Sequence, residues 1–495
     1  MSKRLLIPTL LFVLFFAGMA AIQFATPDLP DNDGFYHIKL AWLMRTESLK
    51  PDFPWLPLSI LNEDEFYDHH FLFHVALIPF TFGDLRVGAK WAAVTFSALT
   101  FLSVWYLFHR QKVPASWLWS LALLGISDAF LYRMSITRAQ SLSLAVLVLG
   151  FAWILEGKYK HLAVLSFLYV WMYDAFPLIL AIAGLHFLAV LLIEHRLEFR
   201  PLLWAGIGIG AGLIINPYFP DNLIFTWHHL LPKLQDATSV SVGNEWYPYD
   251  TSQLLENSLP ALVAFASGAL ALGLSGRKMD LRTVVSFLLT LLFGLMLFKA
   301  RRFVEYFPPF ALIFSAFAWA PLFNMERDES TSPASKSLAG LQMNLPVILL
   351  TAAVSMGIVK TIPAAQEHII DSKPYDLYEG AAIWLEQNTP AGERVFQTDW
   401  DDFQRLFFYN THNTYLAGLD PTYLQLYDSD LYDVWVQITR GEVEQPSQVI
   451  LDRFAARYVH TDLKHGNFLR EAANDPGMIE VYRDGQAVIF EIVEP

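Results

Sequence analysis

Two aspartates, Asp31 and Asp33, are separated by a single residue in a polar segment that follows the first apolar block of the chain. Carboxylates at this spacing are suited to chelating a divalent cation, and a single one is suited to removing a proton from a hydroxyl group. The alternative is structural, because Asp and Asn side chains also build turns between one helix and the next. Residue type and spacing leave both interpretations open.

The same segment contains a second polar group, which runs from Asp68 to His70 and is followed by His74. A helix over 66–78 would place His70 and His74 on one face, with Asp68 and His69 at its start. Imidazole and carboxylate groups together are suited to a metal ion or a phosphate. The alternative is a set of interfacial histidines that anchors a helix at the level of the lipid head groups.

Basic residues form a third group on the side of the membrane that we predict below to be the outer one. They are Arg133, Arg138, Lys299, Arg301 and Arg302. A guanidinium group binds two phosphate oxygens at once, so these residues are candidates for holding a lipid phosphate or pyrophosphate. The alternative is that they snorkel to lipid head groups. A further carboxylate, Glu245, stands beside aromatic residues whose rings could stack on a sugar or a base.

The composition indicates that membrane helices hold these residues. Of the 495 residues, 54% are hydrophobic and 17% are charged, and the mean hydropathy is +0.35. Long apolar blocks must satisfy their backbone hydrogen bonds within the lipid, which favours helices. The net charge of -14 argues against a nucleic-acid partner and fits binding of cations. The absence of cysteine excludes disulfides, thiolate metal sites and cysteine redox chemistry.

Windows of about 20 residues predict about eleven spanning helices. They lie near 5–25, 86–108, 115–131, 140–155, 161–174, 176–193, 201–217, 257–274, 282–298, 303–320 and 344–360. Lys and Arg gather in the short loops of one side, which the positive-inside rule makes cytoplasmic together with the N-terminus. The long segments 26–85 and 218–256 and the C-terminal residues are then predicted to lie outside. The membrane is predicted to be the cell (inner) membrane.

Three further segments complete the predicted organisation. Residues 71–82 are apolar but too short for a span, so we expect an interfacial or re-entrant helix there. Met325 to Lys336 reads as a polar cytoplasmic linker. Residues 361–495 are predicted to form an extracytoplasmic α/β domain after a transmembrane domain over 1–360. Its elements are a helix at 376–388, strands at 394–398 and 456–461, and a hairpin of 479–482 with 487–493 around Asp484-Gly485.

Taken together, the motifs resemble those of the GT-C superfamily of integral-membrane glycosyltransferases. The resemblance lies in Asp31 and Asp33 with Tyr36 after the first span, and in the run from Tyr67 to Leu72 before an apolar helix. Within the superfamily the chain looks most like oligosaccharyltransferase catalytic subunits and polyprenyl-phosphate-sugar transferases. Their acidic motif in the fifth outer loop is similar to Ser239-Val240-Ser241 with Glu245 here, and a basic-aromatic stretch is similar to Arg301-Arg302-Phe303 with Tyr306. Their Trp-Trp-Asp-Tyr-Gly motif has only a partial counterpart in the run from Asp399 to Phe403.

The resemblance implies roles for residues of the three groups and of the C-terminal domain. The general base is Asp33 or Asp31. The residues implied to bind the donor phosphate are Arg301, Arg302, Arg138 and His70. The residues implied for a divalent cation, Mg or Mn, are Asp31, Asp68, His69 and Glu245. The residues implied to bind the acceptor are Trp400, Asp401 and Asp402.

The function implied is transfer of a sugar or glycan from a polyprenyl-(pyro)phosphate donor to an acceptor on the outer face. The implied partners are that donor, membrane lipid, and a glycan, lipid or protein acceptor. Two other classes stay open. A transporter also carries ionisable residues among its helices, although the chain has no visible inverted repeat. A non-catalytic assembly or sensor protein would use the C-terminal domain for binding.

Overall fold

The computed structural model describes residues 3–230, 243–323 and 333–493. The chain divides into two compact units. The helical unit comprises Met1–Thr26, Lys90–Ile215 and Asn244–Asp371, and the mixed unit comprises Pro27–Ala89, Asn216–Gly243 and Ser372–Pro495. The segment after the first helix therefore belongs with the C-terminal residues, whereas the sequence predicted that it belongs to a transmembrane domain over 1–360.

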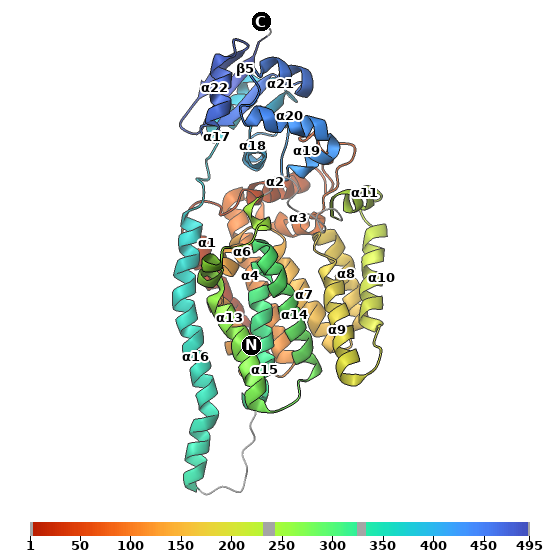
Figure 1. Ribbon diagram of the computed structural model, residues 1–495, viewed down its shortest axis with the longest axis vertical. Helices are drawn as coiled ribbons and strands as arrows, with labels where there is room; N and C mark the ends of the chain where they lie inside the picture. Colours follow the sequence, from red (N-terminus) through yellow and green to blue (C-terminus); the bar gives the residue numbers. More distant parts are fainter. Residues whose placement is uncertain (1–2, 231–242, 324–332, 494–495) are drawn as a thin grey trace. The chain divides into compact units, whose positions relative to one another are not determined.

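The helical unit consists of helices, many of which lie side by side (Figure 1). They are α1 (Lys3–Gln23), α4 (Leu85–Arg110), α5 (Ser116–Leu121), η2 (Ala122–Gly125), α6 (Asp128–Ser135), α7 (Gln140–Leu155), α8 (Tyr159–Met172), α9 (Leu178–Glu194), α10 (Arg200–Ile214), η4 (Asn244–Trp246), α13 (Thr251–Ser275), α14 (Leu281–Lys299), η5 (Arg301–Glu305), α15 (Phe307–Phe323) and α16 (Pro333–Ile370). The last of these, α16, continues ten residues beyond the predicted end at 360, and its buried face continues through Ala365 to Ile369.

Six helices among the described residues are long and apolar enough to cross a membrane. They are Leu5–Gln23, Leu85–Arg110, Thr251–Ser275, Leu281–Lys299, Arg301–Phe323 and Leu345–Ile370. A seventh candidate is the pair α6 and α7, which is bent by 109°. Other apolar helices are shorter, including α9 and α10, so the predicted number of about eleven spans stays a prediction.

Close helix packing in this unit depends on small residues. Helices α8 and α10 lie side by side (Figure 1). A Cβ atom on Gly208 of α10 would stand 2.1 Å from the carbonyl oxygen of Ala163 of α8, so only glycine permits this approach. Small residues at helix contacts are typical of bundles in lipid, where close backbone approach replaces the hydrophobic effect between helices.

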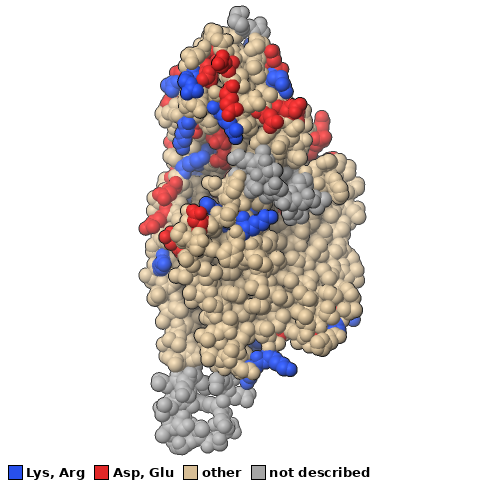
Figure 2. All heavy atoms as spheres, in the orientation of Figure 1, with Lys and Arg blue, Asp and Glu red and all other residues tan. Residues whose placement is uncertain are grey.

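The outward faces of these helices are apolar. Large hydrophobic side chains such as Leu10, Ile207, Leu270 and Met356 are exposed on four different helices. On the face shown in Figure 2, few Lys, Arg, Asp or Glu side chains interrupt the surface over the bundle. Such a surface is unfavourable in water and favourable against hydrocarbon, which identifies an integral membrane protein.

The mixed unit surrounds a five-stranded sheet with helices (Figure 1). Its elements are α2 (Asp33–Thr46), α3 (Phe71–Leu77), η1 (Ile78–Phe80), α11 (Asp221–Phe225), η3 (Thr226–Leu230), α17 (Glu379–Asn388), β1 (Arg394–Gln397), η6 (Trp400–Asp402), α18 (Phe403–Tyr409), β2 (Thr414–Tyr415), α19 (Thr422–Tyr427), α20 (Ser429–Thr439), α21 (Ser447–Phe454), β3 (Tyr458–Asp462), α22 (Gly466–Asn474), β4 (Met478–Arg483) and β5 (Ala487–Ile492). The strand order is β2-β1-β3-β5-β4, in which β1 is parallel to β2 and β3, and β5 is antiparallel to β3 and β4.

One core joins the two sequence segments of the mixed unit. Phe53 and Trp55 of the N-terminal segment pack in the same buried cluster as Phe407 of α18. The Trp55 ring nitrogen donates to the Thr411 carbonyl at 2.9 Å, and the Tyr415 amide donates to the Trp55 carbonyl at 2.8 Å. The segment after the first helix is therefore part of the α/β core rather than a loop on its own.

The predicted strands and hairpin of the C-terminal region are confirmed within one or two residues. The predicted helix at 376–388 begins later, at Glu379, because Tyr378 before it adopts a positive φ of 69°. The helix expected over 66–78 begins at Phe71, because the Asp68 carboxylate accepts from the His70 amide at 3.0 Å and forms a turn. Of the predicted linker Met325 to Lys336, residues 325–332 lie outside the described residues, and α16 has already begun at Pro333.

Candidate functional site

A cluster of arginines and glutamates lies in the helical unit where several helix ends meet. Helix α6 supplies Arg133, and the bend that follows it supplies Arg138. The short helix η4 supplies Glu245, and η5 supplies Arg302 and Glu305. Breaks in the helices allow these side chains to converge, because they project from the last turn of a helix, from short 3-10 helices or from the bend between two helices.

Glu245 is the centre of this arginine cluster. Its Oε2 lies 2.8 Å from Arg133 Nη1 and 3.4 Å from Arg138 Nη1, and its Oε1 lies 3.5 Å from Arg302 Nη1. Arg133 also donates to Glu305, which is only 1% exposed. Three guanidinium groups therefore aim at one anion.

Two aromatic residues fix Arg302 in this cluster. Its Nη2 donates to the Tyr173 hydroxyl at 3.0 Å, and its guanidinium carbon stands 4.1 Å from the centre of the Trp246 ring. Burial alone would raise the pKa of Glu245, but Arg302, Arg133 and Arg138 outweigh that effect and hold the pKa well below its usual range. Glu245 is therefore a carboxylate at neutral pH, and it is the anion that the three arginines hold.

The predicted phosphate-binding residues separate into two groups. Arg138 and Arg302 are both in the arginine cluster. Arg301 precedes Arg302 in η5 but donates to the Pro248 carbonyl at 3.1 Å and lies over the Tyr249 ring. His70 belongs to the mixed unit. Ser239-Val240-Ser241, which resembles part of an acidic motif, lies outside the described residues.

A second polar network lies in the mixed unit and contains the predicted base. Asp33 is the first residue of α2, and its Oδ1 accepts from the Gln404 side-chain amide at 2.8 Å. The preceding Asn32 donates to Asp401 Oδ2 at 2.6 Å and accepts from Arg405 Nε at 2.8 Å. The structure thus brings the predicted base and a predicted acceptor residue into one network.

Asp31 and Asp401 are electrostatic neighbours in this network. Burial raises the pKa of Asp401, Lys373 at 3.3 Å from its Oδ2 opposes the increase, and Asp399 and Asp31 add to it. A carboxyl group with a raised pKa is easier to protonate than an ordinary one. The network therefore contains several carboxylates in different electrostatic environments.

A hydrogen-bonded chain of three buried side chains connects His37 of α2 to Asp68 through His74. Asp68 Oδ2 is 2.7 Å from His74 Nδ1, and His74 Nε2 is 2.7 Å from His37 Nδ1. All three side chains are buried. The ring of His69, by contrast, stacks on Phe225. His70 is the N-cap of α3, its carbonyl accepts from the His74 amide at 2.9 Å, and the centres of the two rings lie 6.0 Å apart, so the predicted neighbours do lie together although α3 begins only at Phe71.

Two of the residues predicted to hold a divalent cation, Asp68 and Glu245, already have other partners. Both carboxylate oxygens of Asp68 already accept hydrogen bonds, from His74 and from the His70 amide. Glu245 belongs to the helical unit, where three arginines surround it. Within the described ranges, no group of three or more His, Asp or Glu side chains is arranged to hold a metal ion. We assign no step to a cation.

The predicted acceptor residues form the short helix η6. Trp400 is half-buried against the core, and Asp401 is partly exposed beside Lys373. Asp402 is buried, and its Oδ2 faces Nδ1 of the fully buried His460 at 3.7 Å. Asp402 is therefore directed into the fold toward His460, whereas a residue that contacts an acceptor must be accessible.

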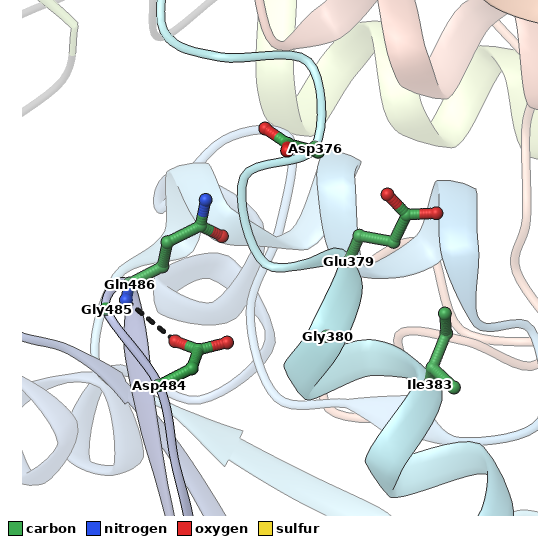
Figure 3. Close-up of a pocket in the computed structure, with 7 residues that line it drawn as sticks. All are labelled: Asp376, Glu379, Gly380, Ile383, Asp484, Gly485 and Gln486. Carbon is green, nitrogen blue, oxygen red and sulfur yellow. Dashed lines mark hydrogen bonds between the residues drawn. The ribbon is translucent and has the colours of Figure 1, made fainter.

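An open depression in the mixed unit lies apart from the predicted residues (Figure 3). Its lining consists of Asp376, Glu379, Gly380, Ile383, Asp484, Gly485 and Gln486. Asp484 accepts from the Gln486 amide at 2.7 Å, which holds the hairpin turn. One of the acidic side chains of the depression, Asp484, therefore has a structural role in the hairpin turn.

Several residues of the two networks were not predicted. Arg405 and Gln404 are buried in α18, and each reaches a partner more than 370 residues away in the sequence. Glu305 follows the predicted Arg302 by three residues, and its charge inside an apolar block was the available signal. Tyr173 had no comparable signal.

The fold and these networks define a class: an integral membrane protein with a bundle of helices, an anion-binding arginine cluster and an α/β unit. Neither the family models nor the curated protein sequences match the chain. Solved structures do. The oligosaccharyltransferase of Archaeoglobus fulgidus in its apo form has a TM-score of 0.66 at 14% identity, covering 98% of this chain and 74% of that chain.

Two other neighbours have the same architecture. ArnT of Cupriavidus metallidurans bound to undecaprenyl phosphate has a TM-score of 0.59 at 13% identity, over 99% of this chain and 98% of that chain. The mycobacterial arabinofuranosyltransferase AftD has a TM-score of 0.57 at 12% identity, over 100% of this chain and 40% of that chain. These structures are GT-C glycosyltransferases, so the predicted resemblance is confirmed at the level of the fold.

Proposed function

We propose that the chain is a glycosyltransferase that moves a sugar from a polyprenyl-phosphate-linked donor to an acceptor on the outer face of the membrane. The observation that carries the proposal is the arginine cluster, in which Arg133, Arg138 and Arg302 converge on one anion position. Two neighbours support the lipid-linked donor, because one is in complex with a dolichol phosphate and one is bound to undecaprenyl phosphate.

Asp33 is the proposed general base. Gln404 donates to its Oδ1, which orients the carboxylate, and α2 begins at this residue. The acceptor hydroxyl transfers its proton to Asp33, and its oxygen forms a bond to the anomeric carbon of the sugar. The bond between that carbon and the phosphate oxygen breaks, and its electron pair leaves with the polyprenyl phosphate.

The arginine cluster is proposed to stabilise the charge that develops on the leaving phosphate. Guanidinium groups fixed before the reaction need not reorganise during it, which makes such stabilisation effective. Tyr173 and Trp246 hold Arg302 in the required orientation. Arg301 and His70 are assigned no direct contact with the phosphate.

The acceptor is proposed to bind beside η6, with Trp400 and Asp401 as the contacting residues. Trp400 offers a ring to stack on a sugar, and Asp401 offers a carboxylate to its hydroxyl groups. The proposal includes the predicted orientation, with the N-terminus cytoplasmic and the mixed unit outside an inner membrane.

The test is transfer of labelled sugar from polyprenyl-phosphate donors to an envelope fraction, comparing the wild type with Asp33→Asn. We expect the variant to lose about two orders of magnitude in kcat, because the base is gone while donor binding remains. The matched control is Asp64→Asn, which makes the same change at an exposed position of the same segment. Equal rates for the wild type and Asp33→Asn would remove the base assignment.

A further inference from the structure

Glu245 occupies the position in the arginine cluster that an anionic ligand would take. It contacts all three arginines, and each contact lies within 3.5 Å. A carboxylate of the chain thus fills the anion position of its own cradle.

The two glutamates of the cluster differ in exposure. The Glu305 side chain is 1% exposed and accepts from Arg133, so it is a permanent buried partner of that charge. The Glu245 side chain is 23% exposed. A buried charge without a partner is costly, so Glu305 stays, whereas Glu245 can turn toward solvent when another anion replaces it.

The backbone around Glu245 belongs to a short element. It lies in η4, a helix of three residues. The Arg301 amide donates to the Tyr247 carbonyl at 3.0 Å, and Trp246 packs on Arg302. Movement of Glu245 away from the arginines therefore involves a helix of three residues rather than a long one.

We propose that Glu245 is an internal competitor that a phosphomonoester displaces when it binds the three arginines. The inference rests on the proposed function and specifies how the same site is regulated. A phosphomonoester carries about -1.5 to -2 charge at pH 7 and three acceptor oxygens, so it satisfies three guanidinium groups better than a carboxylate does. In the proposed reaction that phosphomonoester is the polyprenyl phosphate released when the bond to the sugar breaks, because the sugar-linked donor is a phosphodiester with a single charge. Glu245 therefore keeps weaker anions out of the cradle until the lipid phosphate is released.

The test is the affinity of the full-length protein in detergent for geranyl phosphate and for inorganic phosphate, measured by titration calorimetry. Glu245→Gln removes the competing charge at nearly constant size, so we expect binding about tenfold tighter than in the wild type. The matched control is Glu256→Gln, which makes the same change at an exposed position of α13 and should bind as the wild type does. Tighter binding of both ligands shows that Glu245 competes with the phosphate group itself, and tighter binding of geranyl phosphate alone shows that Glu245 competes with the lipid-linked form.

Equal or weaker binding by Glu245→Gln would overturn the inference. Arg302→Ala separates this failure from that of the proposed function. If Arg302→Ala weakens binding and Glu245→Gln does not tighten it, the phosphate site stands and the competitor does not. If no variant binds geranyl phosphate, both fail. Glu245→Asp, which keeps the charge but retracts the carboxylate, should bind with intermediate affinity and decides the question if the Gln variant does not fold.

Discussion

At the scale of single residues, burial in the mixed unit shifts the pKa of some side chains, and the stability of the unit therefore depends on pH. His460 is fully buried in β3, and burial lowers its pKa to about 4, although Asp462 and Asp484 oppose the decrease. In the unfolded chain an imidazole titrates near a pKa of about 6.5. The unfolded state therefore binds more protons between these two values.

We predict that the mixed unit loses stability as the pH falls from about 6.5 toward 4, by up to about 3 kcal/mol from His460 alone. Asp402 acts in the opposite direction, because burial raises its pKa and its folded form takes up protons first. The measurement compares the pH dependence of thermal unfolding in the wild type and His460→Gln, which should flatten the loss. His195→Gln, at an exposed position, should leave the pH dependence unchanged.

At the scale of elements, Arg405 connects α18 to the N-terminal segment of the mixed unit. Its Nε donates to Asn32, its Nη1 donates to the Pro374 carbonyl at 2.6 Å, and its guanidinium lies over the Phe35 ring. It is among the largest fully buried side chains among the described residues.

Arg405→Ala should destabilise the mixed unit by about 3 kcal/mol, because buried acceptors lose their donor and a cavity remains. Limited proteolysis during urea unfolding reports on this unit separately from the helices. Arg470→Ala removes an arginine that is 61% exposed and should have almost no effect. If the mixed unit of Arg405→Ala is as stable as that of the wild type, Asn32 and α18 are held by other contacts.

The elements themselves could largely be predicted from the sequence. Apolar blocks predicted the long helices, and the alternating pattern with Asp484-Gly485 predicted the hairpin of β4 and β5. The helices α18 to α22 escaped prediction because they are short and pack on the sheet through mixed sequences. The pairing of the first polar segment with the C-terminal domain could not be predicted, because Asn32 and Arg405 are 373 residues apart and no periodic pattern links them.

The candidate sites were predicted in part for the same reason. Arginine against the inside bias is visible in one sequence, so Arg138 and Arg302 could be found. Their convergence on Glu245 is a product of helix breaks, which sequence patterns locate poorly. The cation set stays a prediction, and spacing along the chain says nothing about the hydrogen bonds that already occupy Asp68.

At the scale of the whole molecule, the proposed function requires the mixed unit to lie on the outer side of the membrane. The chain has no cysteine, so single cysteines can report topology. We predict that a membrane-impermeant maleimide labels Lys464→Cys in intact cells, and that it labels Arg277→Cys only after the membrane is opened. Both positions are exposed. Labelling of Arg277→Cys in intact cells, with Lys464→Cys protected, would invert the topology.

The most direct test of the central claim is release of the lipid product. The purified chain in lipid vesicles would be given a polyprenyl-phosphate sugar and an acceptor fraction, and polyprenyl phosphate would be quantified by mass spectrometry. The account predicts that polyprenyl phosphate appears at the same rate as sugar on the acceptor. Intact donor after prolonged incubation with folded protein, across a panel of sugars and lipids, would contradict it.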